Sequence, residues 1–497
     1  MELFIIRKHF ERASHLFLIV FILLFLLFLS VGSASASWSI ETIANNVIPS
    51  DAKISLSADS NGKIHVSYID DNSHSLKYAN NVSGSWNIAT IRSGSVYADG
   101  VSLAIDSIGK VHICSLEINQ SNGNLRDLRY TTNSSGAWVS TLIDTAVGLH
   151  DPAIAVDSNN KIHISYLDDT TYYTLKYTTN ASGSWPIATI VSSYNSGMHP
   201  WLASAIAVDK NNKAHICFYE GSGESYSIKY TTNVSGDWPV TFIDGWGGGI
   251  GGGFQVSIAV DQNIAAHVVY YNHDNDNVKY ATNASGSWIS IIVGEAGVDY
   301  GVHDMSLALD NGGRAHIGYI SWPYAGSTIA LKYVTNKKGT WQTQTIESDG
   351  SEYRSSIAIS PDQRVHIGYY FAPNGSVYYN VRHAYYNDSA PTVTTSSATN
   401  VTPISATLNG TVNPNGLSTT YCFQWGTTTA YGKITPFQSA GSGTGNVSVS
   451  ANLTGLTPNT IYHYRLAAAN SNGTNYGADS LFKKSFALPF LMLLLLN

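Results

Sequence analysis

The chain has 497 residues, of which 12% are charged, and it carries 43 Gly and 31 Tyr. This length exceeds one ordinary hydrophobic core, so either several domains or a repeat array is expected. A net charge of -7 and a pI near 6.1 give no overall basic footprint, which argues against a nucleic-acid partner. The low charge and the abundance of Tyr, Ser, Thr, Asn and Gly favour an extracellular β protein with many turns.

Residues 1–36 have the organisation of a secretory signal peptide. Basic residues precede an apolar run from Leu16 to Val31, and Ala34-Ser35-Ala36 fits a small-residue cleavage site. The run is short for a membrane span, although an uncleaved anchor helix is the alternative. Either interpretation places the rest of the chain outside the cytoplasm, secreted or at the cell surface.

From near Asp59 to near Asn387 the sequence is a repeat, and a His within an apolar run marks each unit. These residues are His65, His112, His163, His215, His267, His316 and His366, spaced 47 to 52 residues apart. Alternating apolar residues between Asn- and Gly-rich turns predict four short strands per unit. In the third unit these are Ile154–Asp157, Lys161–Leu167, Thr174–Thr178 and Trp185–Ile190. Such a unit is typical of a propeller blade.

The seventh unit lacks its last strand, the one that follows Gly-x-Trp in the other units. The N-terminal segment Trp38–Ile43 matches Trp185–Ile190 and is expected to complete that blade, which leaves no long exposed sheet edge. The predicted fold class is therefore all-β. It consists of a seven-bladed β-propeller over 37–388, closed by the N-terminal strand, and a C-terminal immunoglobulin-like sandwich.

Three kinds of residue recur in the units: an Asp six residues before the His, a cation on the third strand, and a Trp before the fourth. The Asp–His pairs are compatible with metal binding or proton transfer. A residue present in nearly every blade is nevertheless expected to serve the fold, since buried polar groups must be hydrogen-bonded. The cations are expected to bury their stems between blades and the Trp rings to pack between outer strands. An anion-binding ring and sugar-stacking platforms are the respective alternatives.

The three cysteines are expected to be buried, inert thiols. Cys114 and Cys217 occupy the same position in non-adjacent units, too far apart for a disulfide, and Cys422 lies in the C-terminal region. No Cys pair has metal-binding spacing.

The motif Asp157-x-x-Asn160-Lys161-x-His163, followed by Tyr166, Tyr177 and Trp185, and its counterparts in the other units resemble the sialidase-like and BNR-type propeller repeats of secreted proteins. This resemblance implies the propeller fold over about 350 residues. The strict Asp-box, Ser-x-Asp-x-Gly-x-Thr-Trp, is absent. A sialidase-like site would also need an Arg cluster, whereas the expected ligand face holds few Arg, chiefly Arg92 and Arg354.

Function is expected where the repeats differ. The connections from strand four to strand one and from strand two to strand three share one face around the central channel, and they place aromatic residues beside carboxylates and His. His150–Asp151 and His303–Asp304 stand at the same offset before strand one. The candidate ligand-binding residues are Asp99, His150, Asp151, His199, Trp201, Trp246, His303, Asp304, Trp322, Tyr324, Tyr353 and Arg354.

After Asn387 the repeat ends, and alternating runs at Ser405–Val412, Thr420–Trp425, Val447–Leu453 and Ile461–Ala467 predict a small β-sandwich. The stretch Leu456-Thr457-Pro458-Asn459-Thr460-x-Tyr462-x-Tyr464-Arg465 resembles a fibronectin type III domain, with Tyr462 at the tyrosine corner. This domain is assigned to 389–484. The hydrophobic tail 485–497 is too short to span a bilayer, and it is either a truncated end or a marginal anchor.

The leading hypothesis is a secreted or cell-surface binding or adhesion protein whose propeller loop face recognises an extracellular glycan or protein. The alternative is an extracellular carbohydrate-active hydrolase or lyase, which needs suitably placed carboxylates. A purely structural surface protein is the third possibility. No catalytic residue is assigned and no cofactor or metal is predicted; calcium is an open alternative that no motif indicates. We expect a monomer that meets a membrane only through its signal or tail segment.

Overall fold

The computed structural model describes residues 38–48, 53–93, 100–119, 125–170, 174–192, 203–222, 225–247, 255–272, 277–295, 299–323, 329–348, 350–373, 376–386, 390–443, 445–470 and 472–483. One compact unit is Trp38–Tyr386, and a second contains the residues from 390 on. All elements of the described residues are β-strands, and none of these residues forms a helix long and apolar enough to cross a membrane. The expected signal peptide and tail lie outside the described residues.

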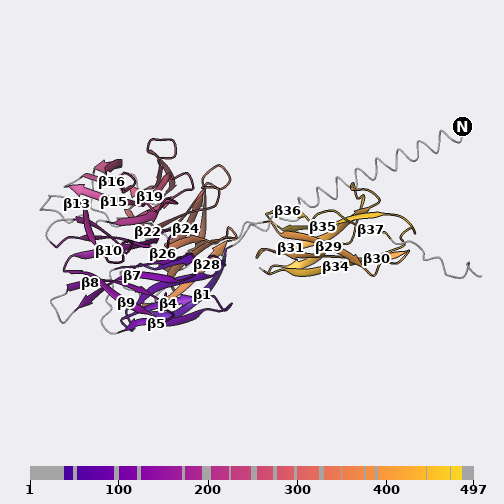
Figure 1. Cartoon of the computed structure of the whole chain (residues 1–497), viewed down its shortest axis with the longest axis horizontal. Helices are drawn as coiled ribbons and strands as arrows, with labels where there is room; N and C mark the ends of the chain where they lie inside the picture. Colours follow the sequence, from indigo (N-terminus) through magenta and orange to yellow (C-terminus); the bar gives the residue numbers. More distant parts are fainter. Residues whose placement is uncertain are drawn as a thin grey trace, which may run out of the picture. The chain divides into compact units, whose positions relative to one another are not determined.

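Seven four-stranded antiparallel sheets make up the first unit (Figure 1). The first two are β2 (Ser55–Ala58), β3 (Ile64–Asp70), β4 (Ser75–Asn80) and β5 (Asn87–Ser93), then β6 (Val101–Ile105), β7 (Val111–Asn119), β8 (Leu125–Thr132) and β9 (Val139–Ala146). The third and fourth are β10 (Leu149–Val156), β11 (Ile162–Asp168), β12 (Thr174–Thr179) and β13 (Ile187–Ser192), then β14 (Ser204–Val208), β15 (Ala214–Ser222), β16 (Ser225–Thr232) and β17 (Val240–Gly247). The fifth and sixth are β18 (Val256–Val260), β19 (Ala266–Asn272), β20 (Asn277–Thr282) and β21 (Ile289–Glu295), then β22 (Asp299–Leu309), β23 (Ala315–Pro323), β24 (Ala330–Thr335) and β25 (Gln342–Glu347).

The seventh sheet joins the two ends of the propeller sequence. It consists of β26 (Gly350–Ile359), β27 (Val365–Pro373), β28 (Tyr379–Tyr386) and the N-terminal β1 (Ser39–Val47), which pairs antiparallel with β28. On the inner side, the Leu56 N–H of the first sheet donates to Ser356 Oγ of the seventh at 3.0 Å. The inner strands β2, β6, β10, β14, β18, β22 and β26 are neighbours in that order, and β26 contacts β2. The sheets therefore form a closed ring, and the propeller prediction is confirmed.

The predicted strands of the third sheet need two corrections. Strand β10 begins at Leu149 rather than at Ile154, because pairing with β11 continues beyond a bulge between His150 and Ala153. Strand β13 begins at Ile187, so Trp185 lies before the strand rather than in it. The bulge contains Asp151, and Trp185 packs against Tyr130 of the neighbouring sheet.

Apolar side chains between adjacent sheets form the core. The residue that follows each repeated His is fully buried, and these residues are Val66, Ile113, Ile164, Ile216, Val268, Ile317 and Ile367. Removal of such side chains from water is the main favourable term in folding. Because every sheet buries the same positions, the ring is held by seven similar interfaces.

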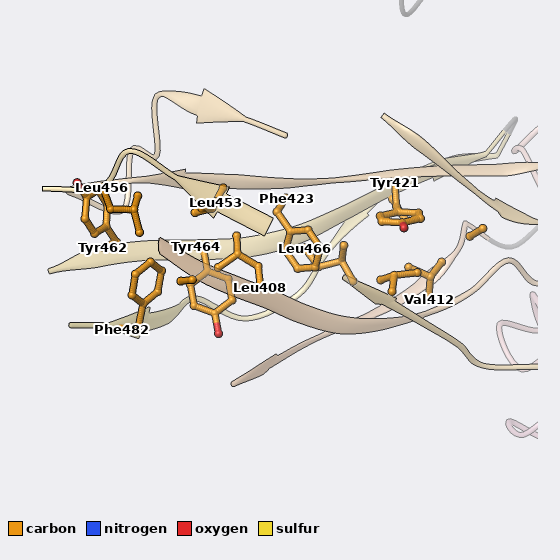
Figure 2. Close-up of a cluster of buried hydrophobic side chains, with 14 residues drawn as sticks. Leu408, Val412, Tyr421, Phe423, Leu453, Leu456, Tyr462, Tyr464, Leu466 and Phe482 are labelled. Carbon is orange, nitrogen blue, oxygen red and sulfur yellow. The ribbon is translucent and has the colours of Figure 1, made fainter. Parts of the chain in front are cut away.

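The second unit contains two sheets whose facing side chains form one core. One sheet is β29 (Thr392–Thr399), β30 (Ser405–Asn413) and β34 (Val447–Thr454); the other is β31 (Thr419–Gly426), β32 (Lys433–Ile434), β33 (Gln438–Gly441), β35 (Tyr462–Asn470), β36 (Gly473–Tyr476) and β37 (Ser480–Phe482). Figure 2 shows Leu408, Phe423, Tyr464 and Leu466 within this core. The Thr457 N–H donates to Tyr462 Oη at 2.9 Å, the contact expected of a tyrosine corner. Assignment to the fibronectin type III family stays a prediction.

Candidate functional site

The repeated Asp and His residues are used by the fold. In the third sheet, Asp157 Oδ1 accepts two backbone N–H groups of the following turn, at 2.9 and 2.7 Å, and Oδ2 lies 3.4 Å from His163 Nε2. His163 Nδ1 lies 2.7 Å from Tyr177 Oη. Burial lowers the pKa of His163 although Asp157 opposes this shift. In the last sheet, Ser360 and His383 take the places of the Asp and the Tyr. The structural interpretation of these residues is confirmed.

Six of the seven repeated Trp rings pack against the Tyr of a neighbouring sheet, and the seventh, Trp86, packs against His383. In the Tyr177–Trp238 contact, for example, the ring centroids are 4.9 Å apart and the planes make an angle of 60°. Such edge-to-face geometry is favourable beyond the area it buries. The other rungs are His383–Trp86, Tyr78–Trp138, Tyr130–Trp185, Tyr230–Trp288, Tyr280–Trp341 and Tyr333–Trp38. The Trp set therefore links each sheet to the next, as the structural interpretation predicts.

Several of the repeated cations on the third strands pair with carboxylates of the preceding sheet. Lys176 Nζ lies 3.2 Å from Asp144 Oδ2 and 2.7 Å from Asp168 Oδ2, and the Tyr166 hydroxyl donates to Asp144 at 2.8 Å. Lys279 pairs with Asp244, and Arg382 pairs with Glu347, in the same way. These cations serve contacts between sheets rather than an anion-binding ring.

One repeat position carries a different residue in most sheets. It lies six residues before the repeated Asp, or before Ser360 in the last sheet, and we call it the channel position. Its occupants, in sheet order, are Lys53, Gly100, Asp151, Ala203, Gln255, Asp304 and Arg354. Because this position lies just before the innermost strand of its sheet or within it, the seven residues surround the centre of the ring.

Side chains from different sheets meet at the channel position. Lys53 Nζ of the first sheet lies 3.0 Å from Asp151 Oδ1 of the third, across the second sheet, where Gly100 stands. A Cβ on Gly100 would lie 2.5 Å from Pro152 Cδ, so the close approach of these inner strands requires glycine there. A contact between sheets that are not adjacent places these two side chains over the centre of the ring.

The remaining polar occupants form a second cluster. With its amide oriented to satisfy both neighbours, Gln255 donates to Asp304 Oδ1 at 3.1 Å and accepts from an Arg354 Nη at 3.2 Å. Asp304 Oδ2 also accepts the backbone N–H of Ser355 at 2.9 Å. Asp304 is only 3% exposed, so it acts as a buried hydrogen-bond acceptor for Gln255 and the Ser355 N–H.

Three of the channel residues adopt an unusual backbone conformation. Asp151, Asp304 and Arg354 have φ angles of 49°, 56° and 54°, in the left-handed region that residues other than Gly rarely adopt. Each lies at a register shift between the first and second strands of its sheet. A bulge redirects the side chain at the point where it occurs. The strained backbone at the three bulges therefore sets the direction in which these three side chains point.

The two channel carboxyls have pKa shifts in opposite directions. Burial acts to raise the pKa of Asp151, but the attraction of Lys53 and His150 outweighs it and lowers the pKa well below the usual range. Burial raises the pKa of Asp304, and the opposing attraction of Arg354 and Lys53 does not overcome it. The Lys53 charge acts on both carboxyls, so the two clusters form one electrostatic unit.

His150 adds an imidazole to this unit. Its Nδ1 lies 4.0 Å from Asp151 Oδ2, and its Nε2 lies 3.9 Å from Asp169 Oδ2, which belongs to the connection after β11. The His150 side chain is 20% exposed, so solvent reaches it. The His150 imidazole, between two carboxylates, can therefore form a hydrogen bond with a ligand.

The structure brings together four of the candidate residues: His150, Asp151, Asp304 and Arg354. It describes the backbone but not the side chains of Trp246, His303, Trp322 and Tyr353. The candidates Asp99, His199, Trp201 and Tyr324 lie outside the described residues. Sequence reasoning missed Lys53 and Gln255. The signal was present, because both stand at the offset that had linked Asp151 with Asp304.

In the described part of the chain, the possible metal ligands are dispersed and the cysteines are buried. There, no group of three or more His, Cys, Asp or Glu side chains is arranged to hold a metal ion. The three cysteines are free and buried, and burial raises the pKa of Cys114 to about 12, which keeps the thiol protonated. The prediction of buried, unreactive thiols is confirmed.

No protein-family model and no curated protein matches the chain. Similar solved structures include an ulvan lyase bound to a glucuronate–rhamnose sulfate unit (12% identity, 69% of this chain and 94% of that chain, TM-score 0.48). They also include the intramolecular trans-sialidase of Ruminococcus gnavus (11%, 71% and 98%, 0.39) and a variant Aleuria aurantia lectin with a fucosylated disaccharide (12%, 62% and 97%, 0.42). Likeness at this level carries no argument about the chemistry of this chain.

Proposed function

We propose that this chain is a secreted or cell-surface protein that binds a glycan at the channel position of its propeller. One observation carries the proposal. The repeated polar residues make their contacts within the fold, whereas the variable residues Lys53, Asp151, Gln255 and Arg354 converge at the centre of the ring. They offer ammonium, carboxylate, amide and guanidinium groups, which together donate and accept hydrogen bonds in fixed directions. Neighbouring hydroxyl groups of a sugar both donate and accept hydrogen bonds, so a sugar-binding site needs donors and acceptors side by side.

The surrounding connections supply the other requirement of a sugar site. In the sequence, Trp201, Trp246, Trp322 and Tyr353 stand in or beside the strand four-to-one and two-to-three connections, and we propose that they contribute aromatic rings to the same site. Aromatic rings stack on the apolar faces of sugars, and few precisely placed polar groups then fix orientation.

The rest of the chain suits this role in the same proposal. Residues 1–36 act as a signal peptide, 37–388 form the glycan-binding propeller, and 389–484 act as a fibronectin type III spacer or adhesive unit before the hydrophobic tail 485–497. The protein is extracytoplasmic and monomeric, without a cofactor.

A glycan array probed with the full secreted chain tests the proposal. The wild type should bind a defined set of glycans, and Lys53→Ala and His150→Ala should each weaken that binding at least tenfold. The matched control is Lys176→Ala, which removes a cation paired between sheets and should retain binding. Loss of binding in the control alone, or no glycan bound by the folded wild type, would refute the proposal.

The opposite pKa shifts of Asp151 and Asp304 favour one alternative, a hydrolase or lyase. Two carboxyls whose surroundings separate their pKa values can divide acid and base roles. Incubation with a polysaccharide panel, followed by assays for new reducing ends and for unsaturated products, distinguishes the two. Turnover that disappears in Asp151→Asn would establish the enzyme, and its absence with intact binding would leave a lectin.

A further inference from the structure

We infer that the glycan recognised at the channel position is uncharged, and that the pairing of Lys53 with Asp151 enforces this selectivity. This inference rests on the proposed glycan-binding function and names the ligand class of the same site. Acidic sugars, which carry carboxylate or sulfate groups, need a cation that is not already compensated. The channel position provides its cations already matched with carboxylates.

The charges at the channel position cancel. Two cations, Lys53 and Arg354, face two carboxyls, Asp151 and Asp304, and the other three occupants are Gln255, Gly100 and Ala203. Lys53 is 3.0 Å from Asp151, and Gln255 bridges Arg354 to Asp304. An anionic ligand would have to displace a carboxylate from its cation, whereas a neutral hydroxyl can add a hydrogen bond to both partners.

Two arginines farther from the centre are also paired with carboxylates. Arg92 Nε lies 2.6 Å and Arg129 Nε lies 3.1 Å from the carboxylate of Glu117, and Arg129 also reaches Asp127 at 3.0 Å. Glu117 is itself buried. Arg92 is one of the Arg residues that the sequence analysis assigns to the ligand face, and its guanidinium is already paired with Glu117.

The propeller segments outside the described residues contain carboxylate side chains but no Lys or Arg. The propeller segments outside the described residues are 49–52, 94–99, 120–124, 171–173, 193–202, 223–224, 248–254, 273–276, 296–298, 324–328, 349 and 374–375. Their sequences contain Asp51, Asp99, Glu224, Asp274, Asp276 and Asp349 but no Lys or Arg. All these segments belong to the strand four-to-one or two-to-three connections. The sequence therefore supplies no further Lys or Arg in these segments that would favour an anionic ligand.

The substitution Asp151→Asn tests the inference because it keeps the side-chain size and removes the charge that compensates Lys53. Paired neutral glycans and their carboxylated or sulfated counterparts are titrated against the full chain. The wild type should bind the neutral member at least tenfold more tightly. In Asp151→Asn the preference should shrink severalfold, because Lys53 becomes available to an anion.

Asp144→Asn is the matched control. It removes a carboxylate from Lys176, which keeps Asp168, and it lies between sheets away from the channel. Its preference should equal that of the wild type. A wild type that prefers acidic glycans would overturn the inference while the glycan-binding function stands, as would an unchanged preference in Asp151→Asn. A folded wild type that binds no glycan of either class would overturn both.

Discussion

The two faces of the propeller differ in how they use polar residues. On the turn face, which holds the strand one-to-two and three-to-four turns, the same contacts recur: Asn180 Oδ1 accepts the Ile162 N–H at 2.8 Å, and Asn81, Asn133, Asn233 and Asn283 accept the equivalent N–H groups at 2.7 to 2.8 Å. On the loop face, the residue at the channel position changes from sheet to sheet. The residues of the turn face thus stabilise the ring, whereas those of the loop face can vary without loss of these contacts.

In a repeat fold, ligand-binding residues can occupy the positions that differ between the units. Polar residues that recur are consumed by hydrogen bonds, since an unpaired buried polar group is costly. A single variable position, just before or within each inner strand, then brings six side chains and Gly100 to the centre of the ring without changing the repeated interfaces. Substitutions on the turn face should therefore change stability, and substitutions at the channel position should change binding and its pH dependence.

The largest expected effect belongs to a residue of the repeated set. Tyr280→Ala removes the partner of His267 and the ring against Trp341, and it should destabilise the propeller by about 3–5 kcal/mol, as large aromatic truncations do. Urea denaturation followed by Trp fluorescence measures the change. Glycan binding by the fraction that remains folded should be unchanged; an altered glycan preference would break the distinction between the two faces.

The two channel carboxyls should give opposite pH trends. The folded pKa of Asp151 is lowered, so its charge stabilises the fold above the unfolded pKa of about 3.9, and this stabilisation is lost as pH falls toward the folded pKa. Asp151→Asn should cost roughly 1.5–3 kcal/mol at pH 7, as loss of a charged hydrogen bond does, and less in acid. Equal costs at pH 7 and pH 3 would contradict the assigned shift.

The folded pKa of Asp304 is raised, so its contribution to stability changes with pH in the direction opposite to that of Asp151. Stability conferred by its protonated form is present below about pH 3.9 and is lost as pH rises through the raised folded pKa. Relative to wild type, Asp304→Asn should therefore become more stable as pH increases from 4 to 7. Urea midpoints of both variants over this range, compared with Asp237→Asn on the exposed turn face as control, measure the two trends.

The repeated His residues should make the turn-face motif sensitive to acid. Burial lowers the folded pKa of His215, so the neutral form stabilises the fold, and this stability is lost as pH falls below the unfolded value of about 6.5. Replacing His215 with Gln should reduce the pH dependence of unfolding by about 1.4 kcal/mol per pH unit in this range. Urea titrations at pH 7.5 and 5.5 test it; an unchanged slope would mean that folding does not lower the pKa of His215.

Much of the propeller was predictable because its information is repeated. Seven copies of the His and Trp, and six of the Tyr, made the strands and the N-terminal closing strand visible in the sequence. The bulge at Asp151 was not, since a positive φ at Asp has no local sequence signature, and the predicted first strand was therefore too short. In the second unit, β29 and β36 were missed because Thr, Ser and Asn dominate them and no apolar alternation marks them.

The candidate site was predictable only in part, for a physical reason. His150, Asp151, Asp304 and Arg354 were selected because polar residues preceded a strand in a variable connection. Lys53 was not selected, although it occupies the same offset before Asp59, because only the three-dimensional contact with Asp151 shows that sheets one and three meet. Contacts between non-adjacent blades depend on the closed ring, which no single unit encodes.

The smallest expected effect lies in the second unit, where one hydroxyl closes a corner. Tyr462→Phe removes the acceptor of the Thr457 N–H and should lower the stability of this unit by about 1 kcal/mol, the usual net value of one hydrogen bond. Hydrogen exchange of the full chain measures the change in the amides of β30 and β35 separately from those of the propeller. Tyr476→Phe, at an exposed ring, is the control and should leave both units unchanged. Because the corner belongs to the sandwich alone, propeller amides and glycan binding should not respond to Tyr462→Phe; a response there would show that the two units share stability.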